Sequence, residues 1–216
     1  MNYPYWEHRS LASVSSYVVG AHERVLSRIS DPCVSLSLWQ RPAELLIAKE
    51  LAQLTAAQLS RARHLTSPTS FDDDLSAMLT KHGLDPEAFS HLRADLRHLA
   101  TLFFPLADTR PVRLRLTTTD ADDCRRFHVD RTYLRLLCTY QGPGTEWLRN
   151  EQVDRQALMC GDPNEAIIRF GTASRFETFW VGITRGDPQN LGQGLVHRSP
   201  PIAGTGQIRV LFCLEC

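Results

Sequence analysis

The spacing of apolar residues predicts a mainly helical first half, covering residues 1–108. Apolar side chains recur at intervals of three and four over residues 42–65, 71–82 and 86–104, a spacing typical of amphipathic helices. Asp85-Pro86-Glu87 has the order cap, proline, acid that starts a helix, and Pro105 is expected to end it. Residues 33–39 instead alternate with period two, which predicts a strand that could join a sheet of the second half.

Residues 109–216 have the pattern of short strands separated by turns rich in glycine, proline and aspartate. The predicted strands cover residues 112–118, 133–140, 166–170, 176–183 and 208–214. Many short strands with such turns are typical of a sandwich or a jelly roll. We therefore expect an α+β protein, in which a helical N-terminal half packs on a C-terminal double-stranded β-helix of the cupin type. The two halves are expected to form one compact unit.

Composition narrows the possible partners. The chain has 216 residues, 24 Lys and Arg and 24 Asp and Glu, so its formal net charge is zero. The basic residues are not gathered in one run, which argues against a nucleic-acid partner. Because no apolar run approaches the ~20 residues that cross a bilayer, and the first residues lack the order of a secretory signal, we expect a soluble, cytoplasmic protein without a membrane partner.

The most informative motif is His128-x-Asp130, which precedes the predicted strand 133–140. In a strand, residues two apart face the same way, so both side chains can reach one ion. His197 follows 67 residues after Asp130, about the length needed to wind round a small β-barrel and return. Two imidazoles and one carboxylate on one face of a metal leave positions open for a co-substrate and oxygen. We therefore expect His128, Asp130 and His197 to be metal ligands and catalytic residues.

Two arginines stand within apolar strand patterns. Arg209 lies in Ile-Arg-Val-Leu-Phe, and Arg135 lies in Tyr-Leu-Arg-Leu-Leu. Burying a charge is costly unless an ion of opposite charge accompanies it, and the planar guanidinium suits a carboxylate. Either arginine could hold a dicarboxylate co-substrate, or each could pair with an acid such as Glu146.

Four segments resemble an uncharacterised bacterial family known as domain of unknown function 1826. They are residues 126–130 (RFHVD), 134–140 (LRLLCTY), 142–147 (GPGTEW) and 196–201 (VHRSPP). This resemblance covers most of the chain and brings no established activity with it.

The order His-x-Asp, distant His, then Arg also resembles, more weakly, the iron(II)- and 2-oxoglutarate-dependent oxygenases. That resemblance implies that His128, Asp130 and His197 bind iron(II). It also implies that Arg209 binds the distal carboxylate of 2-oxoglutarate, helped by Tyr140 or Thr139, and that a small molecule or a protein side chain is the substrate. Those oxygenases often carry a hydroxyl residue two positions after the arginine, where this chain has Leu211.

Alternatives stay open at this stage. The chain could be a cupin-like zinc- or iron-binding protein without oxygenase activity, or an interaction protein that binds no metal. Glu146 could be an additional metal ligand or could neutralise Arg135. The terminal Cys213-x-x-Cys216 could bind zinc only if a second pair of ligands completed the site, and the other cysteines do not have that spacing.

Overall fold

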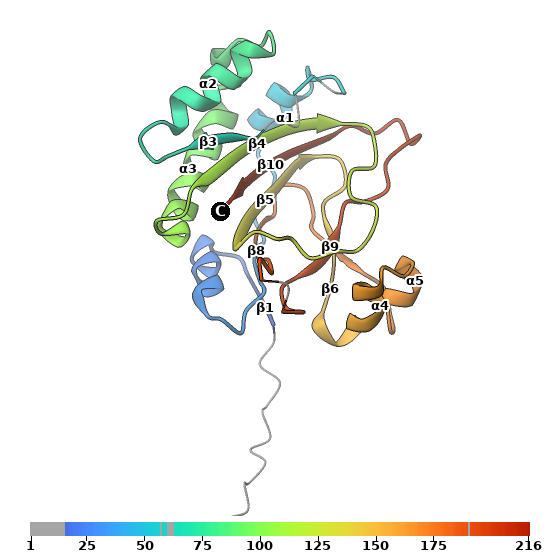
Figure 1. Ribbon diagram of the computed structural model, residues 1–216. Helices are drawn as coiled ribbons and strands as arrows, with labels where there is room; N and C mark the ends of the chain where they lie inside the picture. The colour runs from blue at the N-terminus through green and yellow to red at the C-terminus, as the bar shows by residue number, and fades with distance from the viewer. Residues whose placement is uncertain (1–15, 57, 60–62, 190) are drawn as a thin grey trace, which may run out of the picture.

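The computed structural model describes residues 16–56, 58–59, 63–189 and 191–216, and its strands form two sheets (Figure 1). The larger sheet has the strand order β1-β2-β8-β5-β10-β4-β3. The smaller sheet has the order β7-β6-β9. The strands are β1 (Tyr17–Gly20), β2 (Leu36–Trp39), β3 (His64–Thr66), β4 (Val112–Thr119), β5 (Leu134–Gln141), β6 (Glu146–Leu148), β7 (Ser174–Arg175), β8 (Val181–Arg185), β9 (Val196–Arg198) and β10 (Arg209–Glu215).

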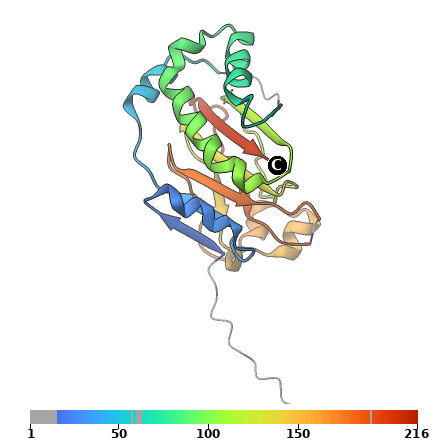
Figure 2. The same ribbon diagram turned by 90° about the vertical axis from the view of Figure 1, so that its left-hand side faces the viewer.

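Helices from the first half of the chain cover one face of the large sheet, and α3 lies across it in Figure 2. The α-helices are α1 (Leu45–Leu51), α2 (Phe71–Lys81), α3 (Ser90–Ala107), α4 (Arg155–Cys160) and α5 (Asn164–Ile167), and the 3₁₀-helices are η1 (Glu23–Ser30), η2 (Pro86–Phe89) and η3 (Asn150–Gln152). Within the described ranges, no helix has both the length and the apolar character needed to span a membrane.

Alternation along the central strands divides the interior into two cores. Leu136, Cys138 and Tyr140 of β5 share a hydrophobic cluster with the helices, as do Val210 and Phe212 of β10. The intervening residues face the other way, where a second cluster joins both sheets; its members are Leu36, Leu38, Leu137, Trp147, Phe176, Leu195, Leu211 and Cys213. Because side chains of a strand point alternately to its two faces, one strand serves both cores. The two sheets therefore pack face to face.

Most predicted elements are confirmed. The run 33–39 supplies β2 and joins the large sheet, and the strands predicted near residues 112, 133 and 208 are β4, β5 and β10. Asp85 caps the N-terminus of η2 as expected, since its side chain accepts a hydrogen bond from the backbone N–H of Glu87. The helical half also supplies β1 and β3, which the apolar pattern did not predict.

The predicted helix 42–65 is wrong in length. Its α-helix ends at Leu51, and β3 begins at His64. Leu54 and Leu59 are buried in the core, and the backbone N–H of Leu59 donates to the side chain of Thr118. Local helix propensity is weak, and here burial of these leucines against the sheet overrides it.

Three other boundaries also differ. Pro105 lies inside α3 and does not end it, since a proline near the last turn removes only one N–H donor and the helix continues to Ala107. The strand predicted at 166–170 does not form: its first two residues end the helical turn α5, and Ile168 makes only an isolated bridge with Val153. The strand predicted at 176–183 starts only at Val181, because Phe179 has a φ of 69°, which no strand residue adopts.

Candidate metal centre

Backbone pairing brings the two histidines together. His197 is the middle residue of β9, and His128 forms an isolated antiparallel bridge with it. Each backbone N–H donates to the carbonyl of the other residue at 3.0 Å. Directly opposed residues of an antiparallel pair project to the same face, and the imidazole ring centroids are 4.7 Å apart. The segment around His128 is thus not the regular strand predicted, yet the bridge alone aligns the two rings.

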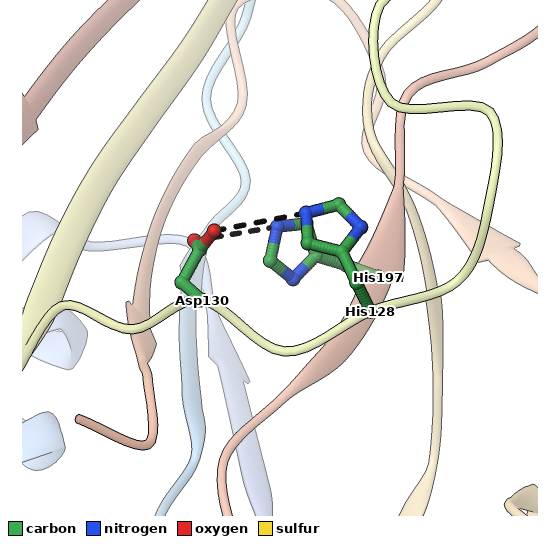
Figure 3. Close-up of side chains that lie close together, drawn as sticks. All are labelled: His128, Asp130 and His197. Atoms are coloured by element: carbon green, nitrogen blue, oxygen red, sulfur yellow. Dashed lines mark ion pairs between the residues drawn. The ribbon is translucent and has the colours of Figure 1, made fainter. Parts of the chain in front are cut away.

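Asp130 completes the group, as Figure 3 shows. Its carboxylate oxygens lie 3.7 Å from Nε2 of His128 and 3.4 Å from Nε2 of His197. One ligand atom from each of the three residues lies within 4.8 Å of the others. Two ligands at about 2.1 Å from one metal can be no more than about 4.2 Å apart. Both carboxylate–imidazole distances are within this limit, and the span of 4.8 Å exceeds it by about 0.6 Å at most, so small side-chain adjustments would bring the three ligand atoms to one ion.

Backbone carbonyls orient both imidazoles. Nδ1 of His128 lies 2.9 Å from the carbonyl oxygen of Arg126, and Nδ1 of His197 lies 3.2 Å from that of Leu195. A carbonyl can only accept, so each Nδ1 carries the proton, and each Nε2 keeps its lone pair directed at Asp130. Histidine ligands of metals characteristically have their second nitrogen held in this way.

Arg135 holds the carboxylate. Its guanidinium lies 2.5 Å from Oδ2 of Asp130 and 2.7 Å from Oε2 of Glu215. Burial acts to raise the pKa of Asp130, but His197, His128 and Arg135 together outweigh it and hold that pKa well below its usual range. Oδ2 is buried and accepts no hydrogen bond of good geometry from the described residues. The Asp130 side chain is thus an ionised, oriented carboxylate whose oxygens face two imidazole lone pairs, which fits a divalent cation.

The two histidines titrate differently, and this sets a pH dependence for metal binding. Burial lowers the pKa of His197 to about 4, despite the nearby Asp130. Burial also acts on His128, but Asp130 and the Arg126 carbonyl outweigh it and raise its pKa above 6.5. A metal ligand must be a neutral imidazole, so the proton on His128 competes with the metal as pH falls.

We therefore expect iron(II) affinity to fall about tenfold per pH unit between pH 6.5 and 5, where only His128 takes up a proton. Equilibrium competition with a metal-binding dye at several pH values measures this slope. A fall of about 100-fold per pH unit, which corresponds to two protons, would mean that both histidines titrate together. A metal affinity that does not change with pH would show that His128 is not a ligand.

Arg209 is buried without a carboxylate partner. It is 2% exposed, the largest fully buried side chain among the described residues. Its guanidinium donates only to hydroxyls, namely Oγ1 of Thr145 at 2.9 Å, Oγ1 of Thr139 at 3.3 Å and Oγ of Ser199 at 3.5 Å. Its Nε has no hydrogen-bond partner in the described chain, and burial lowers the pKa of Arg209 to about 10. A cation in this setting has unused capacity to bind an anion.

Thr145 and Ser199 are site residues that sequence analysis did not identify. The backbone of Gly142 has a φ of 76°, and a Cβ at that position would lie 2.6 Å from the carbonyl oxygen of Ile208, the residue before Arg209. Only glycine permits this approach, which brings the following Thr145 against the guanidinium. Both hydroxyls lie in segments that the sequence had marked, 142–147 and 196–201. Thr145 and Ser199 thus supply hydroxyl groups beside Arg209, whereas Leu211, two positions after the arginine, has none.

Tyr140 does not belong to this site, contrary to the expectation that it binds a co-substrate. Its side chain lies on the helix-facing side of β5, and its hydroxyl donates to Oδ2 of Asp95 on α3. The same carboxylate is paired with Arg41, at 2.6 Å. Thr139, one residue earlier, faces the opposite side and meets Arg209. The alternation of the strand separates the two residues that the sequence had grouped.

Tyr140→Phe is therefore expected to cost stability and to leave binding unchanged. It removes one buried hydrogen bond to a charged group, worth about 1.5 to 3 kcal/mol of unfolding free energy. Urea unfolding measures the loss, and titration with iron(II) and 2-oxoglutarate gives the binding comparison. Weakened co-substrate binding in a fully folded variant would return Tyr140 to the site.

Arg135 and Glu146 also differ from their expected roles. The Arg135 guanidinium is committed to Asp130 and Glu215, so we no longer count it as a co-substrate ligand. Glu146 pairs with Arg175 and Arg198 at 2.5 and 2.7 Å, and therefore neither ligates the metal nor neutralises Arg135. Cys213 and Cys216 lie in different hydrophobic clusters on opposite sides of the sheet, so they do not form a ligand pair.

The triad and Arg209 open into one cavity of about 590 Å³ between the two sheets. His128 is the most exposed member of the triad, with 32% of its side chain accessible, whereas Asp130 and His197 are buried. Across the described part of the chain, this is the only cluster of three or more His, Cys, Asp or Glu side chains that could hold a metal ion. The cavity therefore combines a candidate metal centre with a buried cation.

Comparison with solved structures finds several similar chains. The chain is similar to a dioxygenase for auxin oxidation from rice, with a TM-score of 0.51 and 14% identity over 92% of this chain and 81% of that one. EvdO2 from Micromonospora carbonacea var. aurantiaca aligns with a TM-score of 0.43 and 10% identity, over 92% of each chain. Iron-bound HygX from Streptomyces hygroscopicus aligns with a TM-score of 0.41 and 12% identity, over 91% of this chain and 87% of that one.

Sequence comparison gives a family. No curated protein sequence matches the chain. One family model matches residues 20–215, nearly the whole length, as the four segments quoted above had suggested. The chain therefore belongs to the family described as protein of unknown function (DUF1826).

Proposed function

We propose that this protein is an iron(II)- and 2-oxoglutarate-dependent oxygenase of the hydroxylase type, built on a double-stranded β-helix. The observation that carries the proposal is the shared cavity of the triad and Arg209. Two imidazoles and one carboxylate form a facial ligand set that leaves open positions on the metal. A buried guanidinium without a carboxylate partner supplies what the far end of a dicarboxylate needs.

The residues divide the work as follows. His128, Asp130 and His197 would hold iron(II), and Arg135 would orient the Asp130 carboxylate from behind. Arg209 would bind the distal carboxylate of 2-oxoglutarate, while Thr145 and Thr139 keep its guanidinium in place. Leu137 and Leu211 give the cavity an apolar wall, which limits water near the metal. Bound iron would supply the activation of oxygen, and the protein would orient the co-substrate and exclude water from the metal.

The test is co-substrate turnover without a known substrate. Purified protein given iron(II), 2-oxoglutarate, oxygen and ascorbate as reductant is expected to convert 2-oxoglutarate slowly to succinate and CO2. One oxygen atom enters succinate, and ascorbate supplies the two electrons that reduce the other to water. NMR follows succinate, and an oxygen electrode follows the gas. Asp130→Ala is the inactive control. Equal succinate from wild type and Asp130→Ala would contradict the proposal.

A zinc- or iron-binding protein without oxygenase activity is the second candidate. The triad alone favours it, because neutral imidazole and carboxylate also accept zinc. It predicts tight metal binding with no binding of 2-oxoglutarate. Arg209 separates the candidates, because a simple metal site has no use for a buried arginine that faces its cavity.

A further inference from the structure

The cavity beside the metal centre carries more positive charge than the proposed co-substrate requires. Seven arginines line it, against three acids, Asp123, Asp130 and Glu215. The arginines are Arg63, Arg113, Arg115, Arg131, Arg135, Arg198 and Arg209. The chain as a whole is neutral, so this excess is local. Arginines gathered around a concave surface raise the local concentration of anions.

Ion pairs account for only part of this charge. Arg135 and Arg63 share Glu215, at 2.7 and 3.1 Å, and Arg198 pairs with Glu146. Arg209 is assigned to 2-oxoglutarate under the proposed function. Arg113 and Arg115 of β4, and Arg131 near the cavity mouth, form no ion pair with any acid in the described part of the chain.

The strand register places Arg113 and Arg115 apart from Arg209. In the pairing of β4 with β10, Arg115 lies opposite Cys213 and Arg113 opposite Glu215. These partners are four and six residues beyond Arg209, or about 14 and about 20 Å at the rise of a β-strand. Arg113 and Arg115 are two residues apart, so both side chains face the cavity. Across the sheet, Arg113 and Arg115 lie in the rows of Arg135 and Leu137 of β5, and Arg135 contacts Asp130 of the triad. Neither guanidinium is the one assigned to the co-substrate, and both are on the side of the cavity that leads to the metal centre.

We propose that the substrate of this enzyme carries an anionic group, a carboxylate or a phosphate, which Arg113 and Arg115 bind. The inference rests on the proposed function, since it assigns the substrate side of the same cavity. Arginine's planar set of donors matches both anions. Arg113 is exposed and Arg115 half-buried, so the subsite is open to a ligand that enters from solvent. The rest of the substrate then lies between this subsite and the triad.

The test is a titration of the metal-free, full-length chain with inorganic phosphate and, separately, acetate at constant ionic strength. Isothermal calorimetry is expected to detect binding of at least one anion, and Arg113→Gln/Arg115→Gln should weaken it at least about tenfold. Whichever of the two binds more tightly indicates whether the anionic group of the substrate is a phosphate or a carboxylate. Arg28→Gln/Arg169→Gln, which neutralises two exposed arginines elsewhere, is the matched control and should change binding less than twofold.

Two outcomes would overturn the inference. One is that neither anion binds wild type, and the other is that the Arg113/Arg115 variant binds like the control. Thermal unfolding of both double variants verifies that they are folded. Arg209→Met separates this inference from the proposed function. Phosphate binding that persists in Arg209→Met, beside a wild type that forms no succinate, would support the anion subsite and reject the oxygenase.

Discussion

His197→Ala is expected to weaken iron(II) binding by more than about 100-fold, the largest effect of any single change in the triad. His197 is buried, and its Nε2 faces the Asp130 carboxylate at 3.4 Å. Loss of an outer-shell partner typically costs 10- to 100-fold in metal affinity, and loss of a direct ligand should exceed that range. Competition titration with a metal-binding dye measures the change.

A second variant protects this prediction from a folding defect. His128 is the more exposed histidine, so His128→Ala should remain folded and still lose most of its iron affinity. His22→Ala, which removes an exposed histidine far from the cavity, is the matched control and should bind iron as wild type does. Iron affinity that survives in folded His128→Ala and His197→Ala would reject the metal centre.

Arg209→Met is expected to abolish 2-oxoglutarate binding and at the same time to stabilise the protein. Loss of a buried, charge-assisted contact should lower the affinity for 2-oxoglutarate at least about 100-fold. Burial lowers the pKa of Arg209 to about 10, because the nearby charge of Asp123 offsets only part of the cost of burying the guanidinium. Its replacement by an apolar side chain of similar length should raise the unfolding free energy by about 1 to 3 kcal/mol.

The paired readout makes this prediction specific. Calorimetric titration gives the 2-oxoglutarate affinity, and urea unfolding gives the stability. A merely structural Arg209 would show the opposite pattern, a destabilised variant with unchanged ligand binding. Arg28→Met, at an exposed position on η1, is the control and should alter neither quantity.

The three candidate metal ligands could be predicted from sequence because their chemistry is tied to spacing. His128 and Asp130 are two residues apart, and an extended backbone needs no regular strand to direct both side chains at one point. The sequence separation between Asp130 and His197 was about that expected for a chain that passes once around a small β-barrel and returns. Arg209 was evident as a charge in an apolar strand. To predict these four residues, only the local periodicity of strands and the cost of burying a charge had to be considered.

The errors arose where tertiary contacts decide between near-equal alternatives. Tyr140 and Thr139 are adjacent, and only the register of β5 assigns one to the helices and the other to the cavity. Arg135 and Arg209 looked alike in sequence, but Arg135 forms ion pairs with Glu215 and Asp130, whereas Arg209 forms none with the described acids and has only the more distant charge of Asp123. Thr145 reaches Arg209 through the close approach of Gly142 to Ile208, which no sequence pattern encodes.

The most direct test of the central proposal is anaerobic addition of iron(II) and 2-oxoglutarate to the protein, followed by visible absorption. Chelation of 2-oxoglutarate by iron in the triad is expected to give a weak charge-transfer band in wild type. Arg209→Met should lack the band at the same ligand concentration while it still binds iron. Absence of the band in iron-loaded wild type, or a band of equal strength in Arg209→Met, would contradict the account.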